Sequence, residues 1–369
     1  MRKVKTTGLL VVGLFIILHL SSCNKEDNGP TNFMTNPNAP NTPGSTPWSI
    51  PVSEVFDGGP GKDGIPALEN PEKGGLSSGT YILDSELVLG YFDGVNAVAY
   101  PHKILDWHEI INDELSPFIF PFAITYCPLT GTGIGWERSG SGTTTTFGVS
   151  GLIYENNLIP YDRKTGSNWS QMRLDCVNGA LIDTKVKTFP LVETSWKTWR
   201  EMYPNTEVVT LNTGHDRSYD VYPYGDYKTN ENFLLYPLRT VDRRLNGKER
   251  VHGIIIDGIA KAYRFGSFDA NTSLINDVIN GEDVVIVGNT ARNFIVSFYS
   301  KLRDGSTPVF TAVDKNEVVL EDDLGNEWDV FGYAVSGPAK GQRLKTTESF
   351  IGYWFSWGTF YPDLEIYGK

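Results

Sequence analysis

The sequence has few cysteines, no excess of basic residues and no long apolar segment beyond its first twenty residues. It holds three cysteines in 369 residues and carries a formal net charge of -12. Three cysteines cannot build a disulfide-rich scaffold, and an acidic chain without a basic cluster lacks the electrostatic surface that binds nucleic acid. The sequence therefore predicts a globular body with no nucleic-acid partner.

The N-terminal residues have the composition of a lipoprotein export signal. A basic start precedes an apolar run over residues 8–20, which is too short to cross a bilayer of about 30 Å as a helix. The run leads into LSSC, which resembles the bacterial lipobox and ends at Cys23. We predict a signal peptide over residues 1–22, either of this lipoprotein type or of the ordinary secretory type. In the lipoprotein case, cleavage precedes Cys23, and diacylglycerol on its sulfur anchors the chain to a membrane.

Residues 23–60 lack apolar periodicity and are rich in Asn, Pro, Thr and Gly. A segment of this composition cannot bury enough surface to offset its ordering entropy, so we expect a flexible tether after the lipidated Cys23. The acidic run at residues 24–27 resembles the surface-export tag of some Gram-negative lipoproteins, or is merely part of a solvated tether. The expected location is therefore the outer membrane, facing the cell surface.

The remainder of the chain contains a tandem repeat. Residues 61–204 include VLGYFDGVNAVAY, IIND and WKTWREMYP, and residues 250–369 include VHGIIIDGIAKAY, LIND and WFSWGTFYP. Two copies of this length indicate a duplicated domain, because a solenoid needs shorter units and at least three of them. We predict two related strand-rich lobes joined by a tyrosine-rich connector over residues 205–249, with the second copy degenerate.

The coarse pattern predicts a mixed α+β fold that is mainly β. Each copy opens with two strand-like runs around Asp-Gly, the strongest short-range hairpin signal. In the first copy, apolar residues at helical spacing follow over Ile104–Leu115. In the second copy the same pattern is weaker, at Leu274 and Val278. Further strands are expected at 119–126, 284–287 and 295–299, and a helix capped by Thr194 or Ser195 is expected over 196–203.

Features present in one copy alone are not needed to build the shared scaffold. The first copy alone has His108, Cys127 and the glycine-rich turn Thr130-Gly131-Thr132. A thiol at a strand end, before free backbone N–H groups, is suited to nucleophilic catalysis with an oxyanion hole, and His108 is the available base. Cys127 and His108 are therefore the candidate catalytic residues, and Thr130, Gly131 and Thr132 are candidate substrate-binding residues.

Other interpretations of these residues stay open. Cys127 could form a disulfide with Cys176 or be an inert buried thiol, and His108 could be a satisfied core histidine. His102, His108 and Cys127 could also ligate a metal, although their spacing matches no compact zinc pattern, so no metal ligand is assigned.

Two further residues are candidates for substrate binding. Ser150 lies in a GVSG turn that misses the G-x-S-x-G spacing of a nucleophile elbow. Trp107 belongs to the first copy's helix, whereas most other tryptophans recur in both copies and fit core packing.

Several runs resemble the bacterial family grouped as domain of unknown function 3179. They are DGIPALENP, YPHKILDWHEIIND, TYCPLTGTG, FGVSGLIYENNLIPYDR, NWSQ and PYGDY, spread over about residues 55–300. The resemblance implies no reaction, cofactor or substrate. It places Trp107, His108 and Cys127 inside the family's signature.

These observations lead to three functional hypotheses for a membrane-anchored lipoprotein. The first is thiol-based acyl transfer or hydrolysis at Cys127 and His108. The second is a non-catalytic surface module that binds a small molecule, glycan, peptide or partner protein through its aromatic residues. The third and weaker hypothesis is copper or zinc handling.

Overall fold

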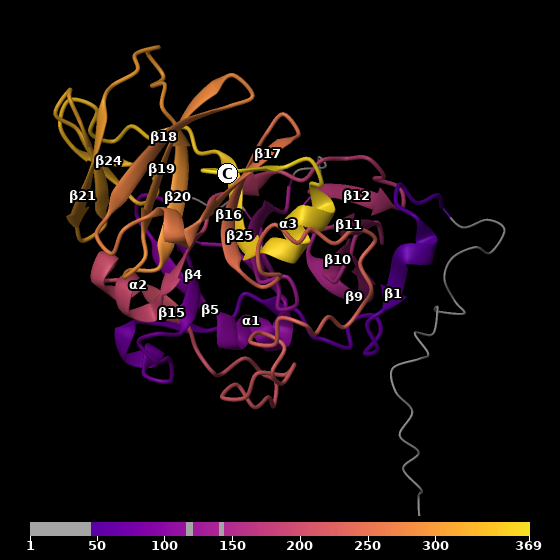
Figure 1. Ribbon diagram of the computed structural model, residues 1–369. Helices are drawn as coiled ribbons and strands as arrows, with labels where there is room; N and C mark the ends of the chain where they lie inside the picture. The colour runs from indigo at the N-terminus through magenta and orange to yellow at the C-terminus, as the bar shows by residue number, and fades with distance from the viewer. Residues whose placement is uncertain (1–45, 116–120, 140–143) are drawn as a thin grey trace, which may run out of the picture. The chain divides into compact units, whose positions relative to one another are not determined.

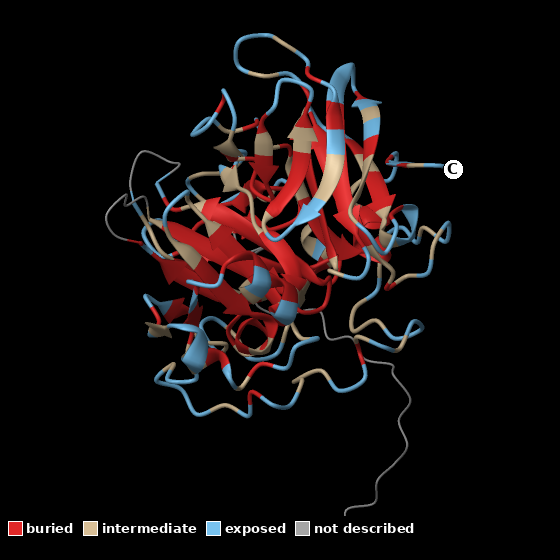
Figure 2. Ribbon diagram, turned by 90° about the vertical axis from the view of Figure 1, so that its left-hand side faces the viewer, coloured by how far each residue is buried: buried red, intermediate tan, exposed pale blue. Residues whose placement is uncertain are grey.

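The computed structural model describes residues 46–115, 121–139 and 144–369, and within these the chain is mainly β with three short α-helices (Figure 1). The strands form six sheets. Figure 2 shows that the strands are buried over most of their length, whereas exposed residues gather in the connections. The predicted mixed, mainly β fold is confirmed.

The first half (residues 61–204) is built around a sheet that starts from the predicted hairpin. Strands β4 (Leu87–Phe92) and β5 (Ala97–Pro101) pair antiparallel. The turn between them is tight because Asp93 Oδ1 accepts hydrogen bonds from the backbone of Val95 at 2.8 Å and Asn96 at 2.7 Å. Three strands complete the sheet in the order β14-β4-β5-β15-β3, namely β14 (Val192–Ser195), β15 (Glu207–Val209) and β3 (Lys73–Gly74).

The second half (residues 250–369) has a sheet with the same pairing order. Strands β16 (Arg250–Ile256) and β17 (Ile259–Arg264) form its hairpin, and Asp257 and Gly258 hold positive φ angles of 49° and 83° in the turn. The outer strands are β25 (Glu348–Tyr353), antiparallel to β16, and β26 (Glu365–Ile366), parallel to β17. In the first half β14 is likewise antiparallel to β4, and β15 is parallel to β5.

A seven-residue helix comes after the outer strand in each half. Helix α2 (Trp196–Met202) begins where Ser195 Oγ accepts a hydrogen bond from Thr198 N, so the predicted cap is confirmed. Helix α3 (Trp354–Phe360) is its counterpart. Each helix presses a tryptophan onto a strand glycine, because a Cβ on Gly90 would lie 2.1 Å from Trp199 and one on Gly253 would lie 2.2 Å from Trp357.

Two further sheets are built from the first half and the short strand β1 that precedes it. One has the order β1-β9-β10-β11-β12 and the other β13-β8-β7-β6-β2. Their strands are β1 (Val55–Asp57), β2 (Leu68–Glu69), β6 (Ile110–Asp113), β7 (Phe122–Cys127), β8 (Thr132–Glu137), β9 (Phe147–Tyr154), β10 (Asn157–Asp162), β11 (Asn168–Ser170), β12 (Asp175–Asn178) and β13 (Thr188–Phe189).

The second half also has two further sheets, in the orders β18-β19-β20 and β21-β22-β23-β24. Their strands are β18 (Ser273–Ile279), β19 (Glu282–Asn289), β20 (Phe294–Tyr299), β21 (Phe310–Lys315), β22 (Val318–Asp322), β23 (Glu327–Asp329) and β24 (Ala334–Ser336). Strands β19 and β20 confirm the two strands predicted near them.

The shared pairing order and the matched helices support the predicted tandem duplication, which itself stays a prediction. A matched side-chain pair adds to this support. Tyr100 donates a hydrogen bond to Asp113 at 2.7 Å in the first half, and Tyr263 donates one to Asp277 at 2.7 Å in the second.

Two segments that the sequence predicts to be helical have a different secondary structure. The helix expected over Ile104–Leu115 is α1 (His102–His108), and the chain then turns at Glu109 into β6. The segment around Leu274 and Val278 is strand β18. In both places β-branched residues pair along a neighbouring strand, and this tertiary pairing outweighs the helical spacing.

The packed part of the chain begins before residue 60, the expected end of the tether. Trp48 forms a β-bridge with Asn178, and β1 pairs with β9. The predicted signal peptide and Cys23 lie outside the described residues. After β15 the connector (205–249) runs mostly as loops, as predicted, and its Tyr227 is fully buried.

Candidate functional site beside helix α1

Helix α1 ends at a residue with an unusual backbone. Pro101, which has no N–H group to leave unpaired, precedes the helix as its N-cap. At the other end Glu109 has φ 57° and ψ -33°, and its N–H donates to Leu105 O at 2.8 Å. A non-glycine residue at positive φ is uncommon and costs conformational energy. This turn lets Ile110 enter β6 and leaves the Glu109 side chain beside a cavity.

The cavity has a volume of about 340 Å³ and lies beside the C-terminal end of α1. Its walls come from the segment before β2, from the end of α1, from β9 and from the connector. The residues that line it are Gly58, Pro60, Gly64, Ile65, Asp106, Trp107, Glu109, Leu129, Val149, Gly151, Leu152, Ile153, Arg217, Pro223, Tyr224, Leu235 and Tyr236. Most of this lining is apolar or aromatic, as is typical of small-molecule pockets.

Glu109 places a nearly desolvated carboxyl group at this pocket. The residue is 4% exposed, and Tyr224 donates a hydrogen bond to its Oε1 at 3.2 Å. Burial raises the pKa of Glu109 from 4.5 to about 7, with a contribution from the charge of Asp106, although the Tyr224 hydrogen bond acts in the opposite direction. The carboxyl therefore exchanges its proton near neutral pH, where a ligand can alter its charge.

The neighbouring Asp106 fastens the connector to α1. Lys228 Nζ lies 3.1 Å and 2.9 Å from the two carboxylate oxygens. Burial raises the pKa of Asp106, and the attraction of Lys228 counters this. Trp107, a predicted binding residue, lines the pocket and donates from its indole to Val221 O at 3.1 Å. These contacts hold the connector over the pocket.

His108 is fully buried, and both of its ring nitrogens have partners. Nδ1 lies 2.7 Å from Pro66 O and Nε2 lies 2.6 Å from the Tyr219 hydroxyl. Because a carbonyl can only accept, Nδ1 carries the proton and Nε2 accepts from Tyr219. Burial lowers the pKa of His108 to about 4, opposed by the Pro66 hydrogen bond. The ring is neutral at pH 7 and joins α1 to two loops.

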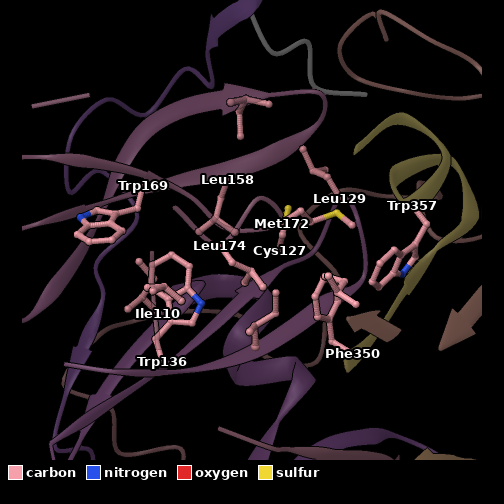
Figure 3. Packing of buried hydrophobic residues seen from close by; sticks show 14 of the residues in the cluster. Ile110, Cys127, Leu129, Trp136, Leu158, Trp169, Met172, Leu174, Phe350 and Trp357 are labelled. Atoms are coloured by element: carbon pink, nitrogen blue, oxygen red, sulfur yellow. The ribbon is translucent and has the colours of Figure 1, made fainter. Parts of the chain in front are cut away.

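Cys127, the predicted nucleophile, ends β7 inside the apolar core and is 1% exposed. Figure 3 shows it among Leu129, Leu158 and Met172. Its Sγ lies 3.6 Å from Asn156 O. Burial raises the pKa of the Cys127 thiol to about 11, and the charge of Glu109 adds to this, so the thiolate is disfavoured.

The structure does not join Cys127 and His108 by a hydrogen bond, because both histidine nitrogens bind other partners. Cys127 and Cys176 are both free thiols. The Cys176 thiol donates to Asn178 O at 3.3 Å.

The predicted substrate-binding turn lies in a polar network within the core. Thr130 and Thr132 are fully buried, with their hydroxyls 2.8 Å apart, and Thr132 donates to Gln171 Oε1 at 2.7 Å. Gly131 N donates to Cys127 O at 2.8 Å, and Thr130 O accepts from Tyr353 N at 2.8 Å. These hydroxyls, the Gly131 amide and the Thr130 carbonyl are therefore occupied by protein partners.

Ser150 lies in strand β9, where its Oγ donates to Ile159 O and accepts from Leu152 N at 3.0 Å. It supports the irregular pairing of β9 with β10 and does not line the pocket. Of the predicted binding residues, Trp107 alone is among those that line it.

Within the described residues no group of three or more His, Cys, Asp or Glu side chains is arranged to hold a metal ion. His102, one of the alternative ligands, has its Nε2 3.3 Å from Glu193 Oε2, without hydrogen-bond geometry.

Glu109, Tyr224 and Tyr236 are not among the candidate site residues predicted from the sequence. The signal for Glu109 is its place directly after Trp107 and His108 and before the apolar pair Ile110-Ile111. The signal for Tyr224 is its place in the tyrosine-rich connector. Nothing local pairs it with Glu109, because 115 residues separate the two.

Comparison with protein families matches residues 62–364 to the family described as "Protein of unknown function (DUF3179)". No curated protein and no solved structure gives a significant match.

Proposed function

Since the chain belongs to the family of proteins of unknown function DUF3179, whose description names no activity, we propose from the site alone that it binds a small molecule in the pocket beside α1. The observation that carries this proposal is the Glu109 carboxyl, which is 4% exposed, lines the pocket and has a pKa of about 7. A carboxyl group in a cleft whose pKa is strongly shifted by desolvation is a candidate for a functional site.

The lining specifies the chemistry of the ligand. Aliphatic walls from Ile65, Leu129 and Val149 favour an apolar body, and the rings of Trp107 and Tyr236 offer aromatic faces. One polar group of the ligand would meet Glu109. When protonated, this carboxyl donates a hydrogen bond to an acceptor, and when ionised it favours a cation.

Binding accounts for the site better than thiol catalysis does. A nucleophilic cysteine needs a lowered pKa or an adjacent base, whereas the pKa of Cys127 is raised to about 11 and its Sγ contacts a backbone carbonyl. Thiol-based catalysis stays a prediction, which labelling of Cys127 with iodoacetamide would test.

The test uses the anionic apolar dye 1-anilinonaphthalene-8-sulfonate with the purified full-length chain. We expect the dye to bind below pH 7 and to lose affinity as Glu109 ionises, because like charges repel. Glu109→Gln should keep dye affinity constant through neutral pH.

The matched control is Glu155→Gln. Glu155 is 3% exposed and has φ 52°, so it resembles Glu109 in burial and backbone, yet it does not line the pocket. It should retain the pH dependence of the wild type. A pH dependence that persists in Glu109→Gln, or the absence of dye binding, would contradict the proposal.

We further infer that Cys23 carries a lipid that anchors the protein to the outer membrane, facing the cell surface. The lipobox-like LSSC supports this. Separately, no helix within the described ranges is long and apolar enough to cross a membrane. Cys23→Ala should abolish metabolic labelling with palmitate and release the protein from the membrane fraction. Continued labelling would refute the assignment.

A further inference from the structure

The second half contains a buried histidine that its scaffold does not require. His252 lies in β16 directly before Gly253, the glycine that accommodates Trp357. In the first half the corresponding residue before Gly90 is Leu89, which is 1% exposed. An apolar side chain therefore suffices at this place in the sheet.

One ring nitrogen of His252 has no hydrogen-bond partner among the residues that the structure describes. The residue is 3% exposed, its Nε2 lies 2.9 Å from Ser297 Oγ, and its Nδ1 is buried and unpaired. Burial lowers the pKa of His252 to about 3, so the ring is neutral. A buried polar atom left unpaired is destabilising, so an additional partner at Nδ1 would be stabilising.

Hydroxyl groups surround the histidine. Ser297 Oγ lies 2.6 Å from Thr347 Oγ1 and 3.2 Å from Ser349 Oγ, and Thr347 and Ser349 are 3.0 Å apart. Each hydroxyl has one proton to donate and two lone pairs to accept. The cluster can therefore rearrange its hydrogen bonds to suit either donors or acceptors on a ligand.

Two neighbouring cavities, which share part of their lining, adjoin this cluster. His252, Ser297 and Ser349 line an inner cavity of about 20 Å³, which is large enough for one water molecule. The outer cavity has about 260 Å³ and includes Thr188 and Glu348 in its lining. The two cavities share Pro190, Leu191, Thr346, Thr347 and Ser349.

We propose that these cavities form a second binding site, which takes a small neutral polyhydroxylated molecule such as a monosaccharide or cyclic polyol. The wall carries one cation, Lys345, and one anion, Glu348, so it favours no net charge on the ligand. Thr347 and Ser349 line both cavities and match the paired donor and acceptor character of sugar hydroxyls. A single water would fill the inner cavity and leave the outer one unexplained.

This site is independent of the pocket beside α1, because it has a different lining and lies where the two halves meet. Gly133, Ile134 and Gly135 of β8 form one wall, and residues 345–350 leading into β25 form another. Strand β8 and strand β25 pack against each other.

The test is nitrogen NMR of the full-length chain labelled in its histidine rings, with D-glucose, D-mannose and myo-inositol as probes. The His252 signals are assigned by their loss in His252→Gln. We expect at least one probe to shift the Nδ1 signal of His252 saturably and to leave the signals of His108 unchanged.

Ser349→Ala should weaken this binding about fivefold to tenfold, the amount expected for one hydrogen bond. Ser349 is partly exposed, so the variant should keep its fold, which the unchanged His108 signals would verify. Ser150→Ala, which removes a strand serine outside both cavities, should bind like the wild type. A His252 signal that none of the three probes moves, or equal affinity in Ser349→Ala, would overturn the proposal.

Discussion

The two halves of the molecule differ most in the segments directly after their matched hairpins. In the first half β5 leads into α1, whereas in the second β17 leads into the three-residue 3-10 helix η3 (Phe265–Ser267). The pocket lies beside the end of α1, Glu109 directly follows this helix, and its Asp106 and Trp107 contact the connector. A sheet with one pairing order can therefore carry different sites, because the connections contribute no strand pairing and are free to change.

The halves also differ in how deeply they bury the same tyrosine–aspartate pair. The Asp113 side chain is fully buried and is bound by Lys73 at 2.7 Å. Asp277 is 17% exposed in its side chain and is bound by Lys261 at 2.9 Å. The same contact thus lies in two dielectric environments, and this difference can be measured.

The largest expected effect comes from removing these lysines. Lys73→Met leaves a buried carboxylate without its cation and should lower the free energy of unfolding by about 3–5 kcal/mol. Lys261→Met removes a partly solvated pair and should cost about 1 kcal/mol or less. Urea unfolding of the two variants measures the difference, and equal losses would show that burial does not distinguish the halves.

A smaller effect is expected from Glu109, which has no counterpart in η3. Its folded-state pKa of about 7 lies above the unfolded value near 4.5. Its contribution to stability is therefore present below about pH 4.5 and is lost as pH rises through 7, by at most about 3 kcal/mol.

Unfolding free energies of Glu109→Gln between pH 5 and 8 check this expectation. The variant should lose less stability than the wild type as pH rises. Glu282→Gln, an exposed substitution in the second half, should behave like the wild type. Parallel curves for all three proteins would mean that Glu109 is ionised in the fold at neutral pH.

The smallest effect on the molecule is expected for a property that leaves the fold unchanged, the reactivity of the buried cysteine thiols. With a pKa of about 11, Cys127 should react with iodoacetamide at pH 8 more than about a hundredfold more slowly in the folded than in the urea-unfolded chain. Cys176, whose pKa burial also raises to about 11, should behave alike. Rapid labelling of folded Cys127 alone would restore the case for a thiol nucleophile and distinguish the first half chemically.

Local signals in the sequence located much of the fold. The Asp-Gly pairs located both hairpins, and Ser195 marked the start of α2, because these effects act over two to four residues. The comparison of repeats directed attention to the α1 segment, where Trp107 does line the pocket. It did not reveal that Cys127 and the Thr130–Thr132 turn lie in the core, since burial depends on elements that are distant in the chain.

The sequence by itself determined the strand-rich composition, the repeated hairpins, the family and the region that carries the pocket. The tertiary structure decided where α1 ends, which carboxyl group lies at the pocket and how deeply Cys127 is buried. It alone brought Tyr224 to Glu109 and Ser297 to His252, at separations of 115 and 45 residues. Desolvation is the largest cause of the pKa shifts of Glu109, Cys127 and His252. It depends on all of the surrounding chain rather than on neighbouring residues alone.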